Sequence, residues 1–197
     1  MILCSAVWKL REESRSIISP GSFIIGDAMR IPQQRIRKAR CMPLMQEHVP
    51  SRLIMTGSEF RWKSKREYLG LYRTKFLWEE KPLISIIIPN KDHIDDLKRC
   101  IDSIEEKATY RNYEYVIVEN NSTEDETFAY YKELEASNPK AHVVYWDGIF
   151  NYSAINNFGA AHAKGDYLLL LNNDTEIISP DCLEQLLGYC MRPDVGA

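Results

Sequence analysis

The chain has 197 residues, 45% of them hydrophobic, so it is long enough to bury a core and is not expected to be disordered as a whole. Its net charge of −3 conceals an asymmetry, because residues 1–80 contain 15 Lys and Arg against 8 Asp and Glu, whereas residues 81–197 contain 10 against 20. The sequence therefore predicts a basic arm or small module at 1–80, with a net charge of +7, followed by an acidic domain at 81–197, with a net charge of −10.

The cysteines and the hydropathy pattern indicate the cellular compartment in which the protein works. The five cysteines form an odd set without a C-x-x-C pair, which indicates reduced thiols rather than a disulfide framework or a zinc site. No segment approaches the ~20 apolar residues of a membrane span, and the N-terminus lacks the pattern of a signal peptide. We therefore expect a cytoplasmic protein.

The first 80 residues carry two basic clusters, at Arg30–Arg40 and Arg61–Arg66. Such clusters are typical of a peripheral contact with anionic membrane lipid or with a phosphate-bearing partner, although a solvated helix face is their commoner origin. The functional interpretation places the protein at the inner face of the membrane. A nucleic-acid partner is not expected.

From Lys81 onward, short apolar runs alternate with amphipathic stretches. The run Leu83–Pro89 is apolar enough for a strand covered on both faces, and spacings of three and four then predict a helix over 94–104. Further along the chain, the alternation predicts strands at 115–118, 142–146 and 167–171 and helices at 124–135, 154–163 and 181–190. This order is typical of an α/β fold with a mainly parallel sheet flanked by helices.

Three turns after predicted strands are rich in Asn and Asp: Asn90–Asp92, Glu119–Thr123 and Asn172–Glu176. In an open parallel sheet, ligands bind beyond the carboxyl ends of the strands, and a hard divalent cation prefers oxygen ligands. The turns therefore predict a site for a nucleotide and a metal ion. The chain has neither G-x-G-x-x-G after its first strand nor a Walker loop, which disfavours dinucleotide dehydrogenases and P-loop NTPases.

Four segments, ISIIIPNKDHIDDLKRCIDSI, YVIVENNSTED, FNYSAINNFGAAHAKGDYLLLLNNDTE and RPDVGA, occur in an order and spacing that resemble a known family. From about Leu83 to Ala197 the chain is similar to family 2 glycosyltransferases of the GT-A type, a nucleotide-diphospho-sugar transferase fold. The likeness is greatest to the rhamnosyltransferase-like enzymes of O-antigen and cell-wall glycan synthesis.

The resemblance implies which residues bind the donor. Residues of the first turn line the base pocket, Glu119 replaces the family's usual Asp at the nucleobase or ribose, and residues of the third predicted helix and the turn after it shape and flank the diphosphate pocket. The implied donor-binding set is Pro89, Asn90, Glu119, Asn121, Asn157, Gly159, Lys164, Asp166 and Asn173.

The resemblance also implies a metal site. Asn172, Asn173 and Asp174 occupy the DXD position, so Asp174 would hold Mn²⁺ or Mg²⁺ and Asn173 would contact the ribose. The implied reaction is inverting transfer from a dTDP- or UDP-sugar to a saccharide or lipid-linked acceptor.

The family's general base and acceptor pocket follow the RPDVGA segment, so the catalytic residues are not assigned. We expect a truncated glycosyltransferase that is inactive alone, with an uncovered sheet edge beside Tyr167–Leu171 that favours self-association.

Two other functions are consistent with the sequence. A non-catalytic nucleotide-binding or interaction module would use the basic arm to dock and would not need a metal. A nucleotidyltransferase shares the α/β layout but would favour a Gly-rich, basic turn after the first strand, where this chain offers only Lys91.

Overall fold

The structure is a computed structural model that describes residues 7–9, 53–56, 61–68, 71–77 and 81–191. Contacts divide the chain into two units, one formed by Met1–Gly21 with Lys81–Ala197 and the other by Ser22–Glu80. Within the described ranges, no helix combines the length and apolar character that crossing a membrane requires.

The first unit contains a five-stranded sheet in the order β1-β8-β5-β6-β7. Four of its strands are parallel neighbours and β1 is antiparallel to β8, so the predicted, mainly parallel sheet is confirmed. The strands are β1 (Val7–Lys9), β5 (Ile84–Asn90), β6 (Tyr113–Glu119), β7 (Ala141–Tyr145) and β8 (Tyr167–Leu170).

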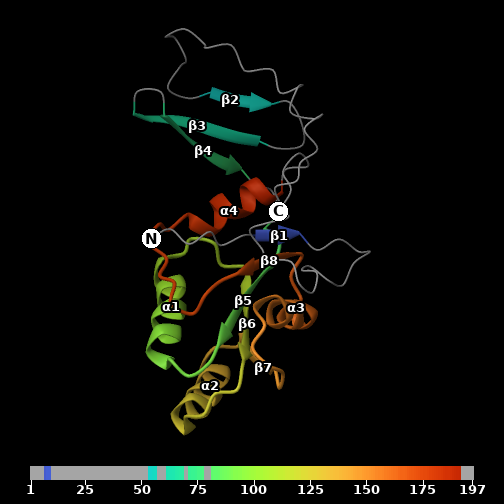
Figure 1. Cartoon of the computed structure of the whole chain (residues 1–197). Helices are drawn as coiled ribbons and strands as arrows, with labels where there is room; N and C mark the ends of the chain where they lie inside the picture. The colour runs from blue at the N-terminus through green and yellow to red at the C-terminus, as the bar shows by residue number, and fades with distance from the viewer. Residues whose placement is uncertain (1–6, 10–52, 57–60, 69–70, 78–80, 192–197) are drawn as a thin grey trace. The chain divides into compact units, whose positions relative to one another are not determined.

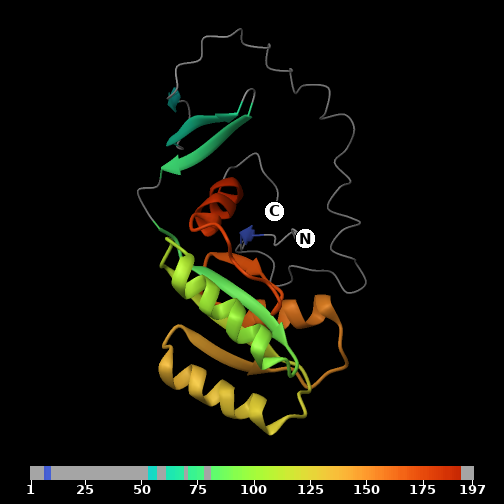
Figure 2. The same ribbon diagram turned by 90° about the vertical axis from the view of Figure 1, so that its left-hand side faces the viewer.

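Helices cover both faces of this sheet. Two of them, α1 and α2, lie on one face and α3 lies on the other (Figures 1 and 2). Every predicted helix and strand of residues 81–191 is present, with ends within three residues of the prediction. The helices are α1 (Ile94–Lys107), α2 (Asp125–Ser137), α3 (Tyr152–His162) and α4 (Cys182–Cys190).

The central strand β5 is buried on both faces and has a proline near its end. Its isoleucines are fully buried between the two helical layers. Pro89 is tolerated because alternate residues of β5 direct their backbone groups toward β8, as the bond from Leu171 N to Ile87 O shows. The ladder with β8 ends at the pair of Ile87 with Leu170, so the missing N–H of Pro89 lies beyond the last paired residue of β5 on that side.

The edge beside β8, which we expected to be uncovered, has a partner strand. Val7–Lys9 pairs antiparallel with Tyr167–Leu169. The expectation was wrong because it took the whole of residues 1–80 as an arm separate from the sheet. A strand supplied from the N-terminal segment removes the physical reason for edge-to-edge association at these residues.

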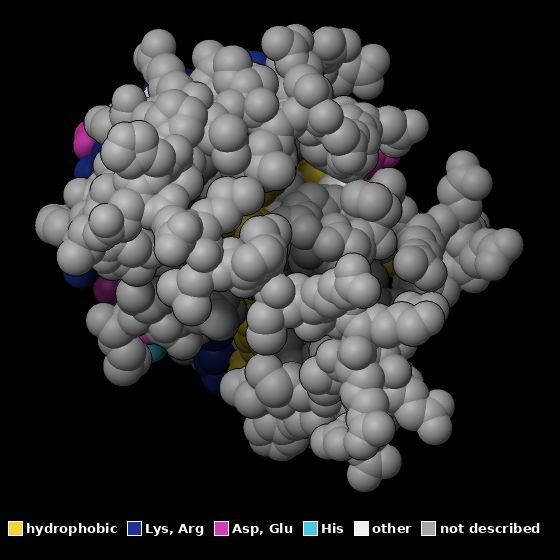
Figure 3. Space-filling model, turned by 90° about the horizontal axis from the view of Figure 1, so that it is seen from above, with side chains coloured by type: hydrophobic (Ala, Val, Ile, Leu, Met, Phe, Trp, Pro, Cys, Tyr) yellow, Lys and Arg dark blue, Asp and Glu magenta, His cyan; other side chains and the backbone are white. Residues whose placement is uncertain are grey.

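The second unit contains an antiparallel sheet of β2 (Leu53–Thr56), β3 (Arg61–Tyr68) and β4 (Leu71–Leu77), in the order β2-β3-β4. The basic cluster Arg61–Arg66 therefore lies on a strand, where alternate residues face opposite sides, and not on a helix. The cluster Arg30–Arg40 lies outside the described residues. Seen from above, small areas of described hydrophobic, basic and acidic side chains are visible (Figure 3).

Helix α3 packs unusually close to the sheet at Gly159. A Cβ atom at this position would lie 2.6 Å from Ile87 Cγ2 and 2.8 Å from Val118 Cγ2, shorter than any normal contact. Both neighbours are fully buried, so neither side chain can move into solvent. The absence of a side chain at Gly159 therefore sets the distance between α3 and the junction of β5 with β6.

We expect Gly159→Ala to lower the free energy of unfolding by about 1–3 kcal/mol, the usual cost of overpacking, even though alanine is the better helix former. Urea denaturation measures this change. Ala161→Ser, at an exposed position of the same helix, is the control and should change the free energy of unfolding by less than about 0.7 kcal/mol. An unchanged or increased stability of Gly159→Ala would contradict this account of the packing.

Candidate functional site

The side-chain amide of Asn90, at the end of β5, joins the turns at the carboxyl edge of the sheet. Its Nδ2 donates hydrogen bonds to Tyr131 Oη and to the carbonyl oxygen of Asp92, both at 2.8 Å, and its Oδ1 accepts one from Asn173 Nδ2 at 2.7 Å. Asn90 is only 3% exposed, so each of these groups depends on a protein partner. The amide thereby fixes Asn173, 83 residues away in the chain, next to the end of β5.

The carboxylate of Glu119, at the end of β6, is buried in the same network. Oε2 accepts hydrogen bonds from Tyr131 Oη at 2.7 Å and from Ser122 Oγ at 2.6 Å, while Oε1 accepts one from Ser122 N. Ser122 Oγ also accepts from Asp92 N at 2.8 Å, which connects the β6 turn to the β5 turn. A carboxylate offers about four acceptor positions, so Glu119 keeps room for one more donor, at Oε1.

Asp92 holds the start of α2 from the neighbouring turn. Its Oδ1 accepts hydrogen bonds from the backbone N–H groups of Thr123 at 2.9 Å and Glu124 at 3.1 Å, which are free donors ahead of the helix. Burial raises the pKa of Asp92, but these bonds and the positive charge of Lys91 outweigh burial and lower the pKa below its ordinary value. Asp92 therefore acts as an ionised cap supplied by another loop.

Left-handed backbone conformations concentrate at this edge. Among the described residues, the non-glycine residues with positive φ are Asp92 at 52°, His93 at 48° and Asn121 at 56°, all in the turns after β5 and β6. Such conformations persist only where the surroundings fix them, and they cluster at functional sites. The hydrogen bonds of Asn90 and Asp92 supply that fixation.

The turn after β8 offers one exposed carboxylate, Asp174. Among the described residues, this carboxylate makes no hydrogen bond or ion pair, and no three His, Cys, Asp or Glu side chains gather around a common point that could hold a metal. Cys100 lies beneath the turn, with its Sγ 3.8 Å from Asn172 O, and burial raises the pKa of its thiol to about 12. The thiol is thus neutral near pH 7 and is a poor metal ligand.

The loop between β7 and α3 is attached to the same edge. Gly148 O accepts hydrogen bonds from Asn121 Nδ2 at 2.9 Å and from the buried Asn120 Nδ2 at 3.4 Å. Helix α3 then begins with its N-terminus at this edge, where Tyr152 Oη donates to Asn172 Oδ1 at 3.5 Å. The half-buried Asn157 follows in the second turn of α3.

Lys164 and Asp166 lie at the opposite edge of the sheet. Lys164 N donates a hydrogen bond to Glu114 Oε1 at 2.6 Å, and Glu114 and Ser85 both stand at the beginnings of their strands. Ser85 precedes Asn90 by five residues along β5, which corresponds to about 17 Å at ~3.3 Å per residue. The structure therefore brings Pro89, Asn90, Glu119, Asn121, Asn173 and Asp174 together but does not bring Lys164 or Asp166 to them.

The cluster at this opposite edge has a structural explanation. Ser85 Oγ donates to the buried Glu114 Oε1 at 2.7 Å and accepts from Gly165 N at 2.8 Å. A Cβ at Gly165 would lie 2.6 Å from Leu83 O, so the turn into β8 touches the β5 backbone. These contacts hold the turn that leads into β8. Gly159, another residue of the implied donor-binding set, allows the close packing of α3 on the sheet.

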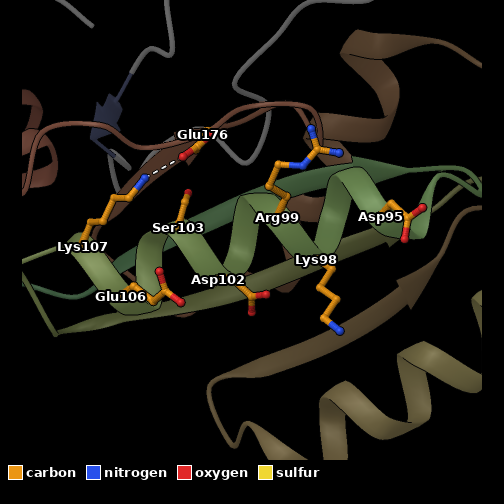
Figure 4. A pocket seen from close by; sticks show the side chains of 8 residues that line it. All are labelled: Asp95, Lys98, Arg99, Asp102, Ser103, Glu106, Lys107 and Glu176. Carbon is orange, nitrogen blue, oxygen red and sulfur yellow. Dashed lines mark hydrogen bonds and ion pairs between the residues drawn. The ribbon is translucent and has the colours of Figure 1, made fainter.

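A pocket of about 250 Å³ lies elsewhere, along the outer side of α1 (Figure 4). Lys98, Arg99 and Lys107 lie there among carboxylates, and Lys107 Nζ forms an ion pair with Glu176 Oε1 at 2.6 Å. Exposed pairs of this kind contribute only ~0–1 kcal/mol. Because its charges of opposite sign offset one another, this pocket is a poor site for an anionic ligand.

Tyr131 is the member of the site that sequence analysis did not identify. It lies on α2, is 1% exposed, and its hydroxyl stands between Asn90 and Glu119. A tyrosine on the apolar side of a helix is ordinary core material, and no spacing rule connects it to residues 41 and 12 positions away. The sequence offers only a general indication for Tyr131: a buried tyrosine hydroxyl normally has a hydrogen-bond partner, but this rule does not say which residue the partner is.

Comparison with known proteins agrees with this geometry. The profile described as "Glycosyl transferase family 2" matches residues 85–197, more than half of the chain. The chain belongs to glycosyl transferase family 2. The match starts one residue after the beginning of β5 and includes every residue of the site described above.

Two curated relatives and one solved structure extend this assignment. The family 2 chain is 41% identical over 126 residues to "O-antigen biosynthesis protein RfbC" of Myxococcus xanthus and 38% identical over 125 residues to "Uncharacterized protein y4gI" of Sinorhizobium fredii. Each match covers 64% of this chain but only 10% and 14%, respectively, of the relative.

The solved structure is the mannosyltransferase PcManGT from Pyrobaculum calidifontis in complex with GDP-Man and Mn²⁺. It superposes with a TM-score of 0.54 at 20% identity, over 60% of this chain and 35% of that chain. The likeness shows a shared GT-A-type fold, as the sequence resemblance predicted.

The hydroxyl of Tyr131 supports Asn173 indirectly, through Asn90. We expect Tyr131→Phe to shift the NMR signals of the Asn173 side-chain amide, to which Tyr131 is linked through the amide of Asn90, and to lower the free energy of unfolding by about 1–3 kcal/mol, since buried groups lose a partner. Tyr115→Phe is the control, because Tyr115 is also buried and its hydroxyl donates to a carboxylate, Glu105 Oε1, at 3.1 Å. If Asn173 responded equally to both variants, or to neither, the relay would not exist.

The Asp92 cap makes stability depend on pH. A carboxyl whose pKa is lowered on folding stabilises the protein above its unfolded-state pKa, and this stabilisation is lost as the pH falls through the folded-state value. We therefore expect Asp92→Asn to reduce the midpoint of thermal unfolding at neutral pH and to differ less from the wild type in acid. Asp102→Asn, at an exposed position in the middle of α1, is the control. A gap between wild type and Asp92→Asn that widens in acid would contradict the capping role.

Proposed function

We propose that the family 2 domain of this chain binds the donor in a transferase that moves a sugar from a dTDP- or UDP-sugar to a saccharide or lipid-linked acceptor in cell-surface glycan synthesis, with inversion. The observation that carries the proposal is the joining of three strand-end turns by Asn90, which holds Asn173, and with it the turn that carries the exposed Asp174, beside the end of β5. We place this reaction on the cytoplasmic side, at the inner face of the membrane.

The base-binding part of the proposal rests on the free hydrogen-bonding capacity of the edge. Pro89 and Asn90 end β5, and Glu119 Oε1 has one acceptor position left for a nucleobase N–H or a ribose hydroxyl. Asn121 stands in the same turn, held by Gly148. We assign these four residues to the nucleoside and Asn157, on the helix that starts at this edge, to the diphosphate side.

The residues at the β8 turn fit a divalent ion that is shared with a diphosphate. Mg²⁺ is usually bound by one or two carboxylates together with substrate phosphates, and Asp174, which follows Asn172 and Asn173 in the chain, supplies one exposed carboxylate. When bound, Mn²⁺ or Mg²⁺ would act as a Lewis acid on the leaving diphosphate. Asp174 would hold the ion, and Asn173, oriented by Asn90, would contact the ribose.

The relatives support a donor of this class. The mannosyltransferase with the same fold was solved with GDP-Man and Mn²⁺, and one curated relative is named for O-antigen biosynthesis. This chain spans 35% and 10% of those two proteins, so the activity of a whole transferase is part of the proposal.

Calorimetric titration with UDP- and dTDP-sugars, with and without Mn²⁺, tests the proposal. We expect Mn²⁺ to strengthen donor binding and Asp174→Asn to remove this gain, with a loss of roughly tenfold to a hundredfold, because bonds to charged groups contribute about 1.5–3 kcal/mol. Asp166→Asn is the matched control. It removes the same charge from an exposed aspartate at the opposite edge and should leave the Mn²⁺ effect intact.

Two outcomes would overturn the proposal. Donor binding that does not respond to Mn²⁺ in the wild type would favour the alternative, a non-catalytic nucleotide-binding or interaction module. Loss of the Mn²⁺ effect in Asp166→Asn but not in Asp174→Asn would move the metal to the other edge of the sheet.

A further inference from the structure

Two consecutive apolar side chains of the loop between β7 and α3 are exposed to solvent. Ile149 is 91% exposed and Phe150 is 67% exposed, although isoleucine and phenylalanine are among the side chains most often found in a protein interior. Of the five exposed large hydrophobic side chains in the described part of the chain, no other two are adjacent in the sequence. Single exposed apolar residues are normal, whereas contiguous ones mark places where a ligand or partner binds.

The loop holds this pair in its exposed position from both sides. Before the pair, Trp146 Nε1 donates a hydrogen bond to Ile149 O at 3.3 Å. After it, Asn151 Oδ1 accepts a hydrogen bond from Ala154 N at 3.0 Å and so caps the first turn of α3. The backbone on either side of Phe150 is therefore fixed by hydrogen bonds, and the exposure of its ring belongs to the folded structure of the loop.

The same loop is bonded to the turn after β6, where the proposed nucleoside contacts lie. Trp146 N donates a hydrogen bond to Glu119 O at 2.9 Å, and Gly148 O accepts one from Asn121 Nδ2 at 2.9 Å. Phe150 follows two residues after the carbonyl group that contacts Asn121. The exposed pair is therefore anchored to the nucleoside part of the proposed site.

The loop and the turn together fit a flat heteroaromatic ring. Glu119 Oε1 offers one acceptor position to an N–H group on the edge of such a ring, and Phe150 offers an exposed aromatic face. Of the parts of a nucleotide sugar, the nucleobase is the one that has both an N–H edge and π faces. Bases stack on aromatic side chains in this way where proteins bind single-stranded nucleic acids.

We propose that Phe150 stacks on the face of the donor nucleobase, an inference that rests on the proposed function. The base presents its N–H edge to Glu119 Oε1 and one face to the phenyl ring, which then leaves water. Ile149 has no π system and does not take part in the stack. This assigns to the site a residue that the resemblance does not include in the donor-binding set.

The stack contributes affinity without choosing a base, because every base has a π face. Selection between bases is left to groups that form hydrogen bonds with the edge of the ring, such as Glu119 Oε1. Replacement of Phe150 is therefore expected to weaken the binding of UDP and dTDP to the same degree.

Calorimetric titration of the full chain with UDP and dTDP in the presence of Mn²⁺ tests the proposal. We expect Phe150→Ala to weaken the binding of both nucleotides by roughly fivefold to 150-fold, the equivalent of about 1–3 kcal/mol. Phe150→Tyr keeps the ring and should bind within about twofold of the wild type, since the stack is retained. Pyrophosphate with Mn²⁺ has no base, so its binding should not respond to Phe150→Ala.

The matched control is Ile149→Ala, which removes an equally exposed apolar side chain without a ring from the same loop. It should change nucleotide binding by less than about twofold, because no stack is lost. Replacement of an exposed side chain usually changes stability by no more than about 0.5 kcal/mol. Thermal unfolding of both variants should therefore match the wild type, which separates a lost contact from lost folding.

Several results would overturn the stack. Nucleotide binding that is unchanged in Phe150→Ala, or equally weakened in Ile149→Ala, would contradict it. A loss confined to UDP-sugars that leaves UDP binding intact would assign Phe150 to the sugar. Reduced sedimentation of Phe150→Ala with phospholipid vesicles, at unchanged nucleotide binding, would assign the exposed pair to a membrane surface.

Failure of this inference and failure of the proposed function give different results. If the wild type binds UDP and Phe150→Ala binds it equally well, only the stack is wrong. If the wild type binds neither UDP, dTDP nor their sugars, the proposed function is wrong and the stack with it.

Discussion

The carboxyl edge of the sheet depends on one buried amide. Asn90 donates to Tyr131 and to the Asp92 backbone and accepts from Asn173, so a single side chain of β5 holds α2, its own turn and the turn after β8. An amide has distinct donor and acceptor ends, and the two bonds made by Nδ2 leave only Oδ1 for Asn173. Because the network is buried, turning the amide over would leave several polar groups unpaired, which gives the turns one arrangement.

The two ends of the parallel sheet use polar residues differently. At the amino edge, Glu114 and Ser85 hold the entry of β8 with hydrogen bonds to each other and to the backbone N–H groups of Lys164 and Gly165. At the carboxyl edge, Asp174 stays exposed and Glu119 keeps a free acceptor position. The family resemblance assigns residues at both edges of the sheet to donor binding. The direction of the strands separates them, because Lys164 and Asp166 lie at the amino edge and the proposed binding residues lie at the carboxyl edge.

The division of the chain by charge coincides only in part with its division into structural units. The excess of positive charge in residues 1–80 includes the basic residues of β3 and β4, whereas the first unit carries exposed carboxylates such as Asp174. The division at Lys81 is not a simple boundary between two objects, because Val7–Lys9 forms the edge strand of the domain that begins at Lys81. The N-terminal part therefore contributes to the family 2 sheet as well as to a sheet of its own.

The α/β alternation from Lys81 onward, the extents of its helices and strands, and the family could all be predicted from the amino-acid sequence, because hydrophobic periodicity and motif spacing are local properties. It also predicted that Asn90, Glu119, Asn173 and Asp174 follow strand ends, and the parallel strand direction then brings these residues to one edge. No sequence pattern indicates that Tyr131 joins this edge, that Lys164 and Asp166 lie at the other, or that Val7–Lys9 pairs with β8. Each of these facts is a contact between segments far apart in the chain, and such contacts follow from how helices and strands pack and pair rather than from any local pattern.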